Sequence, residues 1–110
     1  MADDVFTSIT WFRVKPGRDD HFIRAFVDAG MESRPWSIPG YRGVTMFRSH
    51  TDSDLYYVIG SWDSTDSYGE WRKVARSGAP VGTLDALSDA IVESGPGNIL
   101  SPVVLPVAGE

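Results

Sequence analysis

Strand-like and helix-like segments follow one another along this chain in an order that few folds accommodate. Residues 5–14, 41–49 and 55–62 are rich in β-branched and aromatic side chains, as strands are. Helical spacing of apolar residues follows the first and the third of these segments, and residues 99–107 are predicted to form a last strand. The order β-α-β-β-α-(α)-β predicts an α+β domain built on one antiparallel sheet.

Three helices are predicted from apolar spacing and from capping residues. Ser64 is placed to cap the second helix and Thr83 the third, because a side-chain oxygen there can accept from a free backbone N–H. Each helix has one apolar face, as expected for a helix that packs on a sheet. The residues on these faces are Phe22, Ala25, Phe26 and Ala29, then Tyr68, Trp71 and Ala75, then Leu84, Leu87 and Ile91.

The element order is the split β-α-β-β-α-β arrangement of ferredoxin-like folds, with a four-stranded antiparallel sheet. Two prolines indicate that the last strand lies at an edge of this sheet. Pro102 and Pro106 are four residues apart, so both missing N–H donors face the same side of the strand. An edge strand can leave that side unpaired, whereas a central strand cannot.

Both faces of the predicted strands are apolar. In the first strand, Phe6 and Phe12 lie on one face and Ile9 and Trp11 on the other. Helices cover one face of a ferredoxin-like sheet, so the other would remain as a large apolar surface, which monomers rarely expose. We therefore expect a homodimer in which two sheets pack against each other.

Length and charge exclude several classes of protein. A chain of 110 residues can bury one core, so residues 1–110 are interpreted as a single domain. The net charge is −5 and the ten Lys and Arg residues are scattered, which argues against a nucleic-acid partner. No apolar run approaches the roughly 18 residues of a membrane span, and the N-terminus lacks a secretion-signal pattern. These features predict a cytoplasmic protein with no membrane partner.

The sequence provides no pattern for a metal or nucleotide cofactor. It has no cysteine and two histidines, His21 and His50, so no zinc-type ligand spacing can be written. Glycine-rich loops that bind dinucleotides or nucleoside triphosphates are also missing from the sequence. We therefore expect neither a metal nor a cofactor.

Three large aromatic residues gather where the third predicted strand meets the second helix. The stretch VIGSWDSTDSYGEW, residues 58–71, contains Trp62, Tyr68 and Trp71. Such a cluster either closes the core of a small domain or lines a pocket for a flat aromatic ligand. A buried tyrosine hydroxyl or indole N–H also needs a hydrogen-bond partner.

This corner, together with VKPGRDDHFIRAF and IPGYRGVTMFRS, resembles the antibiotic biosynthesis monooxygenase superfamily of dimeric α+β barrels. The chain is most similar to cofactor-independent members that convert phenolic polyketide intermediates, such as anthrones, to quinones. In that branch a tryptophan and a tyrosine six residues later line the substrate cavity, and Trp62 and Tyr68 match this spacing. The branch has an amide where this chain has Val58, and an arginine where it has Leu84 or Asp85. Both departures remove polar groups proposed to handle substrate oxygens.

A second branch of the superfamily binds and degrades haem. Trp71 matches its tryptophan, but Thr10 stands where that branch has an asparagine. The stretch around Val81 has no histidine to hold the iron. Haem is therefore not expected.

The resemblance implies a set of site residues. Trp62 and Tyr68 are the catalytic candidates, as donors or positioning groups for substrate oxygens. Trp36, in a loop flanked by prolines, is interpreted either as a lid or as a dimer contact. The residues expected to contact the substrate are Phe26, Trp36, Val58, Trp71 and Leu87.

The leading hypothesis is a homodimeric, cofactor-independent monooxygenase for an aromatic polyketide-like phenol or anthrone. Once deprotonated, such a compound can pass an electron to dioxygen without metal or flavin. The protein then needs an apolar pocket for a hydrophobic aromatic molecule and one or two hydrogen-bond donors. Two alternatives stay open: a non-oxidative cyclase or isomerase on the same scaffold, and a non-catalytic small-molecule-binding or accessory protein.

Overall fold

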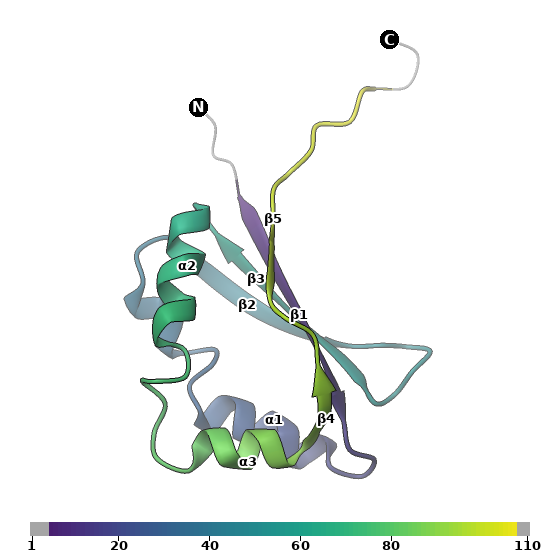
Figure 1. Ribbon diagram of the computed structural model, residues 1–110. Helices are drawn as coiled ribbons and strands as arrows, with labels where there is room; N and C mark the ends of the chain where they lie inside the picture. Colours follow the sequence, from purple (N-terminus) through teal and green to yellow (C-terminus); the bar gives the residue numbers. More distant parts are fainter. Residues whose placement is uncertain (1–4, 108–110) are drawn as a thin grey trace.

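Five strands form a single antiparallel sheet in the computed structural model, which describes residues 5–107 (Figure 1). The strands are β1 (Phe6–Val14), β2 (Tyr41–Arg48), β3 (Leu55–Trp62), β4 (Ile91–Ser94) and β5 (Asn98–Leu100). Their order is β2-β3-β1-β4, and β5 pairs with β1 on the same edge as β4. This topology places β1 and β3 at the centre of the sheet.

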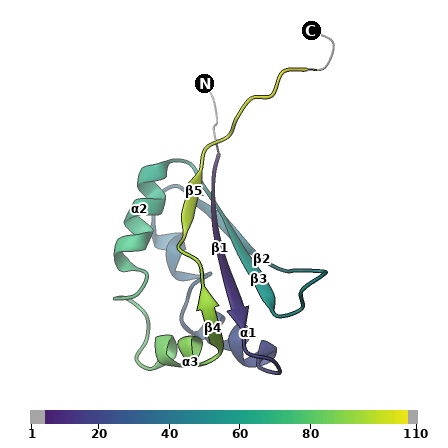
Figure 2. The same cartoon turned by 45° about the vertical axis from the view of Figure 1, so that its right-hand side comes forward.

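Three α-helices pack on the sheet: α1 (Asp19–Asp28), α2 (Thr65–Val74) and α3 (Thr83–Asp89). A short 3-10 helix, η1 (Arg34–Ser37), precedes β2. Helices α1 and α3 lie side by side, and α2 lies further along the sheet (Figures 1 and 2). The ferredoxin-like α+β fold predicted from the sequence is confirmed. None of the helices within residues 5–107 is long and apolar enough to cross a membrane.

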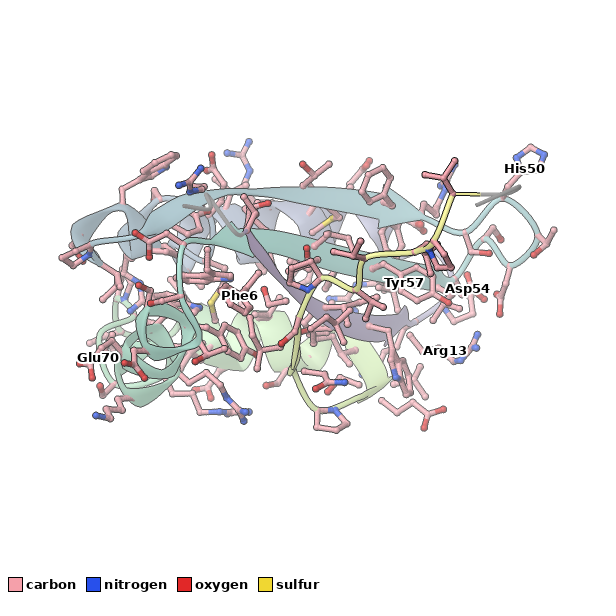
Figure 3. The ribbon with its side chains drawn as sticks, turned by 90° about the horizontal axis from the view of Figure 1, so that it is seen from above. Phe6, Arg13, His50, Asp54, Tyr57 and Glu70 are labelled. Atoms are coloured by element: carbon pink, nitrogen blue, oxygen red, sulfur yellow. The ribbon has the colours of Figure 1, made fainter. Side chains whose placement is uncertain are left out.

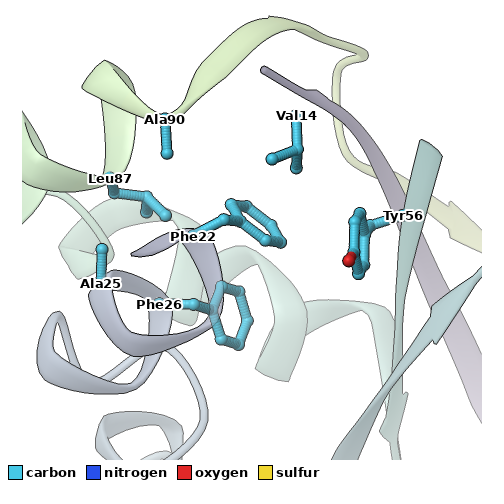
Figure 4. Packing of buried hydrophobic residues seen from close by; sticks show 7 residues of the cluster. All are labelled: Val14, Phe22, Ala25, Phe26, Tyr56, Leu87 and Ala90. Carbon is cyan, nitrogen blue, oxygen red and sulfur yellow. The ribbon is translucent and has the colours of Figure 1, made fainter. Parts of the chain in front are cut away.

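Phe22 lies in the middle of the larger core cluster, between α1, α3 and the sheet (Figure 4). Its ring is fully buried, and its centroid lies 5.5 Å from that of Phe12 and 5.2 Å from that of Tyr56. The predicted apolar face of α1 is confirmed, because Phe22, Ala25 and Phe26 are all buried. Burial of one large apolar side chain stabilises the fold by about 1.5–3 kcal/mol.

A second, smaller core cluster joins α2 to the sheet. It contains Tyr41, Trp62 and Tyr68, with Trp71 and Ile99 packed against it. The ring centroid of Trp62 lies 5.0 Å from that of Tyr41 and 5.5 Å from that of Tyr68. The aromatic corner of the sequence therefore contributes to the core beneath α2.

The last predicted strand is wrong in its bounds. The edge strand beside β1 begins at Ile91, which was expected in the third helix, and ends at Leu100. Residues 101–107 continue as an exposed segment that leaves the sheet (Figures 1 and 2). Pro102 and Pro106 lie in this segment rather than in a strand. A proline cannot donate to the next ladder bond, so Pro102 helps to end the pairing.

The edge strand is also divided into two pieces. Gly95, Pro96 and Gly97 separate β4 from β5. Phe12 pairs with Ser94 and Ile9 with Asn98, so two residues of β1 face three residues of the edge. An extra residue on one strand makes that strand bulge away from its partner. The bulge forms where the four-stranded prediction expected only a loop.

One helix start agrees with the prediction and one does not. Ser64 caps α2, since its side chain accepts from the backbone N–H of Ser67 at 3.1 Å. The N-cap of α3 is Gly82, which has a φ of 84° in the left-handed region that favours glycine. Thr83 is instead the first helical residue, and its hydroxyl donates to the carbonyl oxygen of Pro80.

The face of the sheet opposite the helices is apolar, as predicted. Phe12 and Tyr56 pair across β1 and β3 and belong to the core beneath the helices. Successive strand residues point to opposite faces, so Trp11 and Tyr57 point away from the helices. Strand register places five apolar side chains on this open face: Ile9, Trp11, Phe47, Tyr57 and Ile59.

Candidate functional site

A cavity of about 500 Å³ lies between α1, α3, the C-terminal end of α2 and the edge strand. Small-molecule sites typically have volumes of ~300–1,000 Å³, so the cavity has room for a ligand of that class. Its apolar lining includes Phe12, Phe26, Met31, Leu84, Leu87 and Ile91. Aromatic and aliphatic walls of this kind suit a flat hydrophobic molecule.

The bulge in the edge strand forms one side of the cavity. Gly95, Pro96 and Gly97 all line it, and so does Thr10 on β1. The bulge stays attached to β1 at its first residue, since the Gly95 N–H donates to the Trp11 carbonyl oxygen at 3.0 Å.

Charged side chains line the same cavity. Arg72 belongs to α2, Arg76 follows that helix, and Glu93 belongs to β4. All three residues are exposed, so their charged ends lie where the cavity opens to solvent. Glu93 lies 3.9 Å from Arg13, outside the cavity.

Tyr68 is not among the residues that line the cavity, and its hydroxyl lies behind Gly97, which is one of them. A Cβ atom on Gly97 would collide with Tyr68 Oη and would lie 3.3 Å from Thr10 Oγ1. Within residues 5–107 this hydroxyl has no hydrogen-bond partner, yet no fully buried polar side-chain atom there lacks one. The hydroxyl therefore reaches accessible space, although Tyr68 as a whole is only 8% exposed.

The environment keeps Tyr68 protonated. Burial raises the pKa of its hydroxyl above the ordinary value, and the positive charge of Arg72 opposes that rise. Arg72 Cζ lies 5.8 Å from the centroid of the Tyr68 ring. A phenol with a raised pKa stays neutral at pH 7 and can donate its hydrogen to a ligand oxygen.

The indole N–H of Trp62 is already used inside the protein. It donates to Ser8 Oγ at 2.9 Å, and both residues are buried. Trp62 is not among the residues that line the cavity, and its ring packs against Tyr68 at an interplanar angle of 66°. The hydrogen bond leaves no free donor on the indole. Trp62 was expected to donate to a substrate, and this geometry differs from that expectation. The ring contact instead allows Trp62 to hold the Tyr68 ring in position.

Three of the expected substrate contacts lie in or beside the larger core cluster. Phe26 on α1 and Leu87 on α3 line the cavity. Val58 on β3 packs against the same cluster without lining the cavity. Helices α1 and α3, which are far apart in the sequence, therefore both contribute to the cavity wall.

Two of the expected substrate contacts lie elsewhere. Trp71 lines a separate surface hollow with Arg34, whose Cζ lies 5.0 Å from the Trp71 ring centroid. Trp36 is 60% exposed, and its ring packs edge to face on Tyr41 with centroids 4.6 Å apart. Neither tryptophan lines the 500 Å³ cavity.

The two histidines also lie outside the cavity. His50 is in the hairpin between β2 and β3, at the opposite end of the molecule from Glu70 on α2 (Figure 3). His21 Nε2 lies 3.1 Å from the carbonyl oxygen of Ala86 and links α1 to α3. Within residues 5–107, no group of three or more His, Cys, Asp or Glu side chains is placed to hold a metal ion.

Several residues that line the cavity were not predicted from the sequence. Arg72 lies off the apolar stripe of α2, yet it follows Tyr68 by four residues, and this spacing brings the two side chains together. That spacing was the available signal. Glu93 and Gly97 carry no comparable signal, because their place in the cavity depends on how the edge strand pairs with β1.

The fold matches solved structures over almost the whole chain. A proposed antibiotic biosynthesis monooxygenase from Bordetella bronchiseptica matches with a TM-score of 0.70 at 20% identity, covering 92% of this chain and 99% of that chain. A dimeric ferredoxin-like protein from an uncultured marine organism gives a TM-score of 0.71 at 10% identity, with 98% and 95% covered. A mutant of SnoaB, a cofactor-independent oxygenase from Streptomyces nogalater, gives 0.64 at 21% identity, with 99% and 100% covered. No curated protein sequence matches the chain.

The family itself is shown by the sequence. The sequence model of the antibiotic biosynthesis monooxygenase family matches residues 5–79, which is more than half of the chain. This segment runs from β1 to just beyond α2 and includes Trp62, Tyr68 and Arg72. Helix α3 and the edge strand, which complete the cavity, follow it. The chain therefore belongs to the antibiotic biosynthesis monooxygenase family.

Proposed function

We propose that the protein is a cofactor-independent monooxygenase that acts on a phenol or anthrone of the aromatic polyketide type. The observation that carries the proposal is the Tyr68 hydroxyl, which reaches accessible space behind the wall of an apolar cavity. Family membership supports the reaction class, and so does the fold shared with SnoaB, which is described as a cofactor-independent oxygenase. We expect this activity in the cytoplasm.

The apolar lining would hold the ring system and exclude water. Phe12 and Phe26 offer aromatic surface, and Leu84 and Leu87 offer aliphatic surface from α3. Removal of water from such a site strengthens each hydrogen bond made inside it. The cavity would therefore favour a donor aimed at a developing negative charge.

Tyr68 supplies this donor. When the bound phenol or enol loses its proton, negative charge develops on its oxygen, and the neutral Tyr68 hydroxyl can donate to it. A single preorganised donor of this kind lowers a barrier by about 3 kcal/mol. Trp62, fixed by its hydrogen bond to Ser8, keeps the Tyr68 ring in place.

The proposed reaction balances without an external reductant. The substrate anion passes one electron to dioxygen, and the resulting substrate radical and superoxide combine into a peroxide anion on the ring carbon. This anion takes up one proton, which replaces the proton lost from the substrate, and becomes a hydroperoxide. Loss of water from this hydroperoxide leaves a carbonyl group. An anthrone CH₂ carbon thus gains one oxygen atom, and its two hydrogens leave with the second oxygen as water.

We also propose that the protein works as a homodimer joined through the open faces of two sheets. The open face is apolar across β1, β2 and β3, and such a surface is normally covered by a partner. One protein with the same fold is described as dimeric, which supports this assembly. A second copy is the simplest occupant, because it presents the same apolar surface.

Oxygen dependence tests the proposed function. Purified protein is incubated with a hydroxylated anthrone under air and under nitrogen, and spontaneous oxidation is subtracted. We expect oxygen uptake and quinone formation only under air, with one oxygen atom of isotopically labelled dioxygen in the product. Turnover under nitrogen would instead favour a cyclase or isomerase. Binding without a product in either atmosphere would favour a binding or accessory protein.

A further inference from the structure

The charge at the cavity mouth differs from that of the chain as a whole. The chain has a net charge of −5, yet two arginines and one glutamate line the cavity. Arg72 and Arg76 therefore create a local excess of positive charge beside an apolar space. An uncharged polycycle can only stack on a guanidinium group, whereas an anionic group can also form an ion pair and two hydrogen bonds with it.

Among the described residues, neither Arg72 nor Arg76 forms an ion pair. Arg13 and Arg18 bind carboxylates of distant segments, and Arg34 donates to backbone carbonyl oxygens. Within residues 5–107, Arg72 and Arg76 have no carboxylate within ion-pair distance. Their guanidinium groups are therefore available to a ligand.

Backbone geometry brings the two side chains to one side of the helix. Arg72 and Arg76 are four residues apart, which places them on adjacent helical turns. Helix α2 ends at Val74, but the Gly78 N–H still donates to the Val74 carbonyl oxygen at 3.0 Å. Helical spacing therefore continues across Arg76.

We infer that the ligand carries a carboxylate, which Arg72 and Arg76 bind at the cavity mouth while its ring system fills the apolar interior. The inference rests on the proposed function and specifies its substrate as an aromatic polyketide acid. A guanidinium group is planar and binds a carboxylate through two parallel N–H bonds. The solvent-exposed mouth lets the acid keep part of its hydration, so its burial costs little.

The surrounding charges also orient the acid. Arg72 Cζ lies 5.8 Å from the Tyr68 ring centroid, so a carboxylate on Arg72 lies near the catalytic candidate. Glu93 on β4 lines the same cavity and repels a carboxylate. The carboxylate therefore binds on the α2 side of the cavity mouth. The distance of each ring atom from the carboxylate then determines which ring atoms lie near Tyr68.

Two probes that differ in one charge test the inference. Anthraquinone-2-carboxylate and its methyl ester share a ring system, and calorimetric titration gives the Kd of each. We expect the wild-type protein to bind the acid about tenfold more tightly, as two solvent-exposed ion pairs would provide. Arg72→Gln and Arg76→Gln should each reduce this preference, and the double variant should abolish it. Higher ionic strength should also reduce it.

Lys73→Gln is the matched control. Lys73 lies on the same helix, carries the same charge and pairs with Glu70 at 3.0 Å, away from the cavity lining. We expect this variant to keep the full preference for the acid. An equal loss in the control would show a general charge effect and would overturn the inference.

Failure of the inference can be told apart from failure of the proposed function. Equal affinity for acid and ester, or no binding of either, would overturn the carboxylate assignment. Oxygen uptake with an uncharged anthrone tests the oxygenase activity independently. Uptake without any preference for the acid would leave the proposed function standing, whereas a preference without uptake would overturn only the oxygenase activity.

Discussion

The indole N–H of Trp62 on β3 donates to the hydroxyl of Ser8 on β1, with 2.9 Å between Nε1 and Oγ. Ser8 pairs with Gly60 across the two strands. A Cβ atom on residue 60 would lie 2.6 Å from Ser8 Oγ and 3.0 Å from the indole nitrogen. The hydrogen bond therefore occupies the space that a side chain at residue 60 would fill, and it fixes the ring on which Tyr68 packs.

Replacement of Ser8 by alanine should destabilise the protein. The buried indole N–H would lose its acceptor, and an unpaired buried donor costs about 1–3 kcal/mol. We expect S8A to lower the free energy of unfolding in urea by that amount. Ser53→Ala, at an exposed hairpin position, is the control and should change it by less than ~0.5 kcal/mol. Equal stability of the two variants would contradict the structural role of the bond.

Gly97→Ala and Tyr68→Phe should show strong coupling. A methyl group on residue 97 collides with Tyr68 Oη, so G97A should cost about 1–3 kcal/mol of stability. Without the hydroxyl, the nearest Tyr68 atom would be Cζ at 3.6 Å, an ordinary contact. The double variant should therefore recover most of the stability that G97A loses, as measured by a double-mutant cycle. Additive losses would rule out the close approach of residues 68 and 97.

Tyr68→Phe should remove turnover while binding persists. Loss of one preorganised donor lowers kcat by about 10²- to 10³-fold, whereas the ring and its packing remain. Oxygen-uptake kinetics give kcat, and titration with a non-reactive anthraquinone gives Kd. The raised pKa of Tyr68 also predicts that its loss of a proton does not reduce kcat below pH 10.

Tyr56→Phe serves as the control for Tyr68→Phe. Tyr56 is a buried tyrosine that donates to Asp19, and it does not line the cavity. Its hydroxyl should affect stability but leave kcat nearly unchanged. A similar fall of kcat in both variants would show that turnover depends on packing rather than on the Tyr68 donor.

Stability should decline at alkaline pH as Tyr41 ionises. Burial, aided by the charge of Glu32, raises the pKa of Tyr41 to about 12. The unfolded value is about 10. The folded-state pKa is the higher one, so this stabilisation is complete below pH 10 and is lost as the pH rises toward 12.

Thermal unfolding across this pH range, with ultraviolet absorbance to follow tyrosinate, tests the prediction for Tyr41. We expect Tyr41→Phe to weaken the alkaline decline. Burial also raises the pKa values of Tyr56 and Tyr68, so part of the decline should remain. An unchanged pH dependence in Tyr41→Phe would contradict the assignment.

A charge on the open face should disrupt the proposed dimer. Phe47 is 54% exposed on β2, and Phe47→Lys would place a charge between the two sheets. We expect analytical ultracentrifugation at low micromolar concentration to show a dimer for the wild type and a monomer for this variant. Val27→Lys is the control, because Val27 is 50% exposed on α1, away from the open face. Dissociation by Val27→Lys alone would place the interface on the helices.

Local patterns predicted the central part of the fold but not the edge strand. The helical spacing of Phe22, Ala25 and Phe26 and the β-branched and aromatic residues of β3 are local signals, so these elements could be recognised. Residues 91–94 are too few and too ambiguous for periodicity to separate strand from helix. Their pairing with β1 decides the outcome, and pairing is a tertiary property that local propensity does not contain.

The candidate site was predictable to the extent that it depends on residues close in sequence. The family resemblance implied that Trp62 and Tyr68 line one cavity; their rings are in contact, but neither residue is among those that line the 500 Å³ cavity. Which of the two keeps a free donor depends on Ser8, which lies 54 positions from Trp62 in the sequence. The cavity likewise depends on Gly97, whose contact with Tyr68 follows from the strand register.

The bulge of Gly95, Pro96 and Gly97 is anchored at both ends on a single strand, by β4 before it and β5 after it. Insertions, deletions or larger residues in this short span would reshape one wall of the cavity while the flanking strand pairs stayed intact. Natural variation or directed evolution could thus change the shape of the cavity, and with it the choice of the proposed ligand, without altering the sheet.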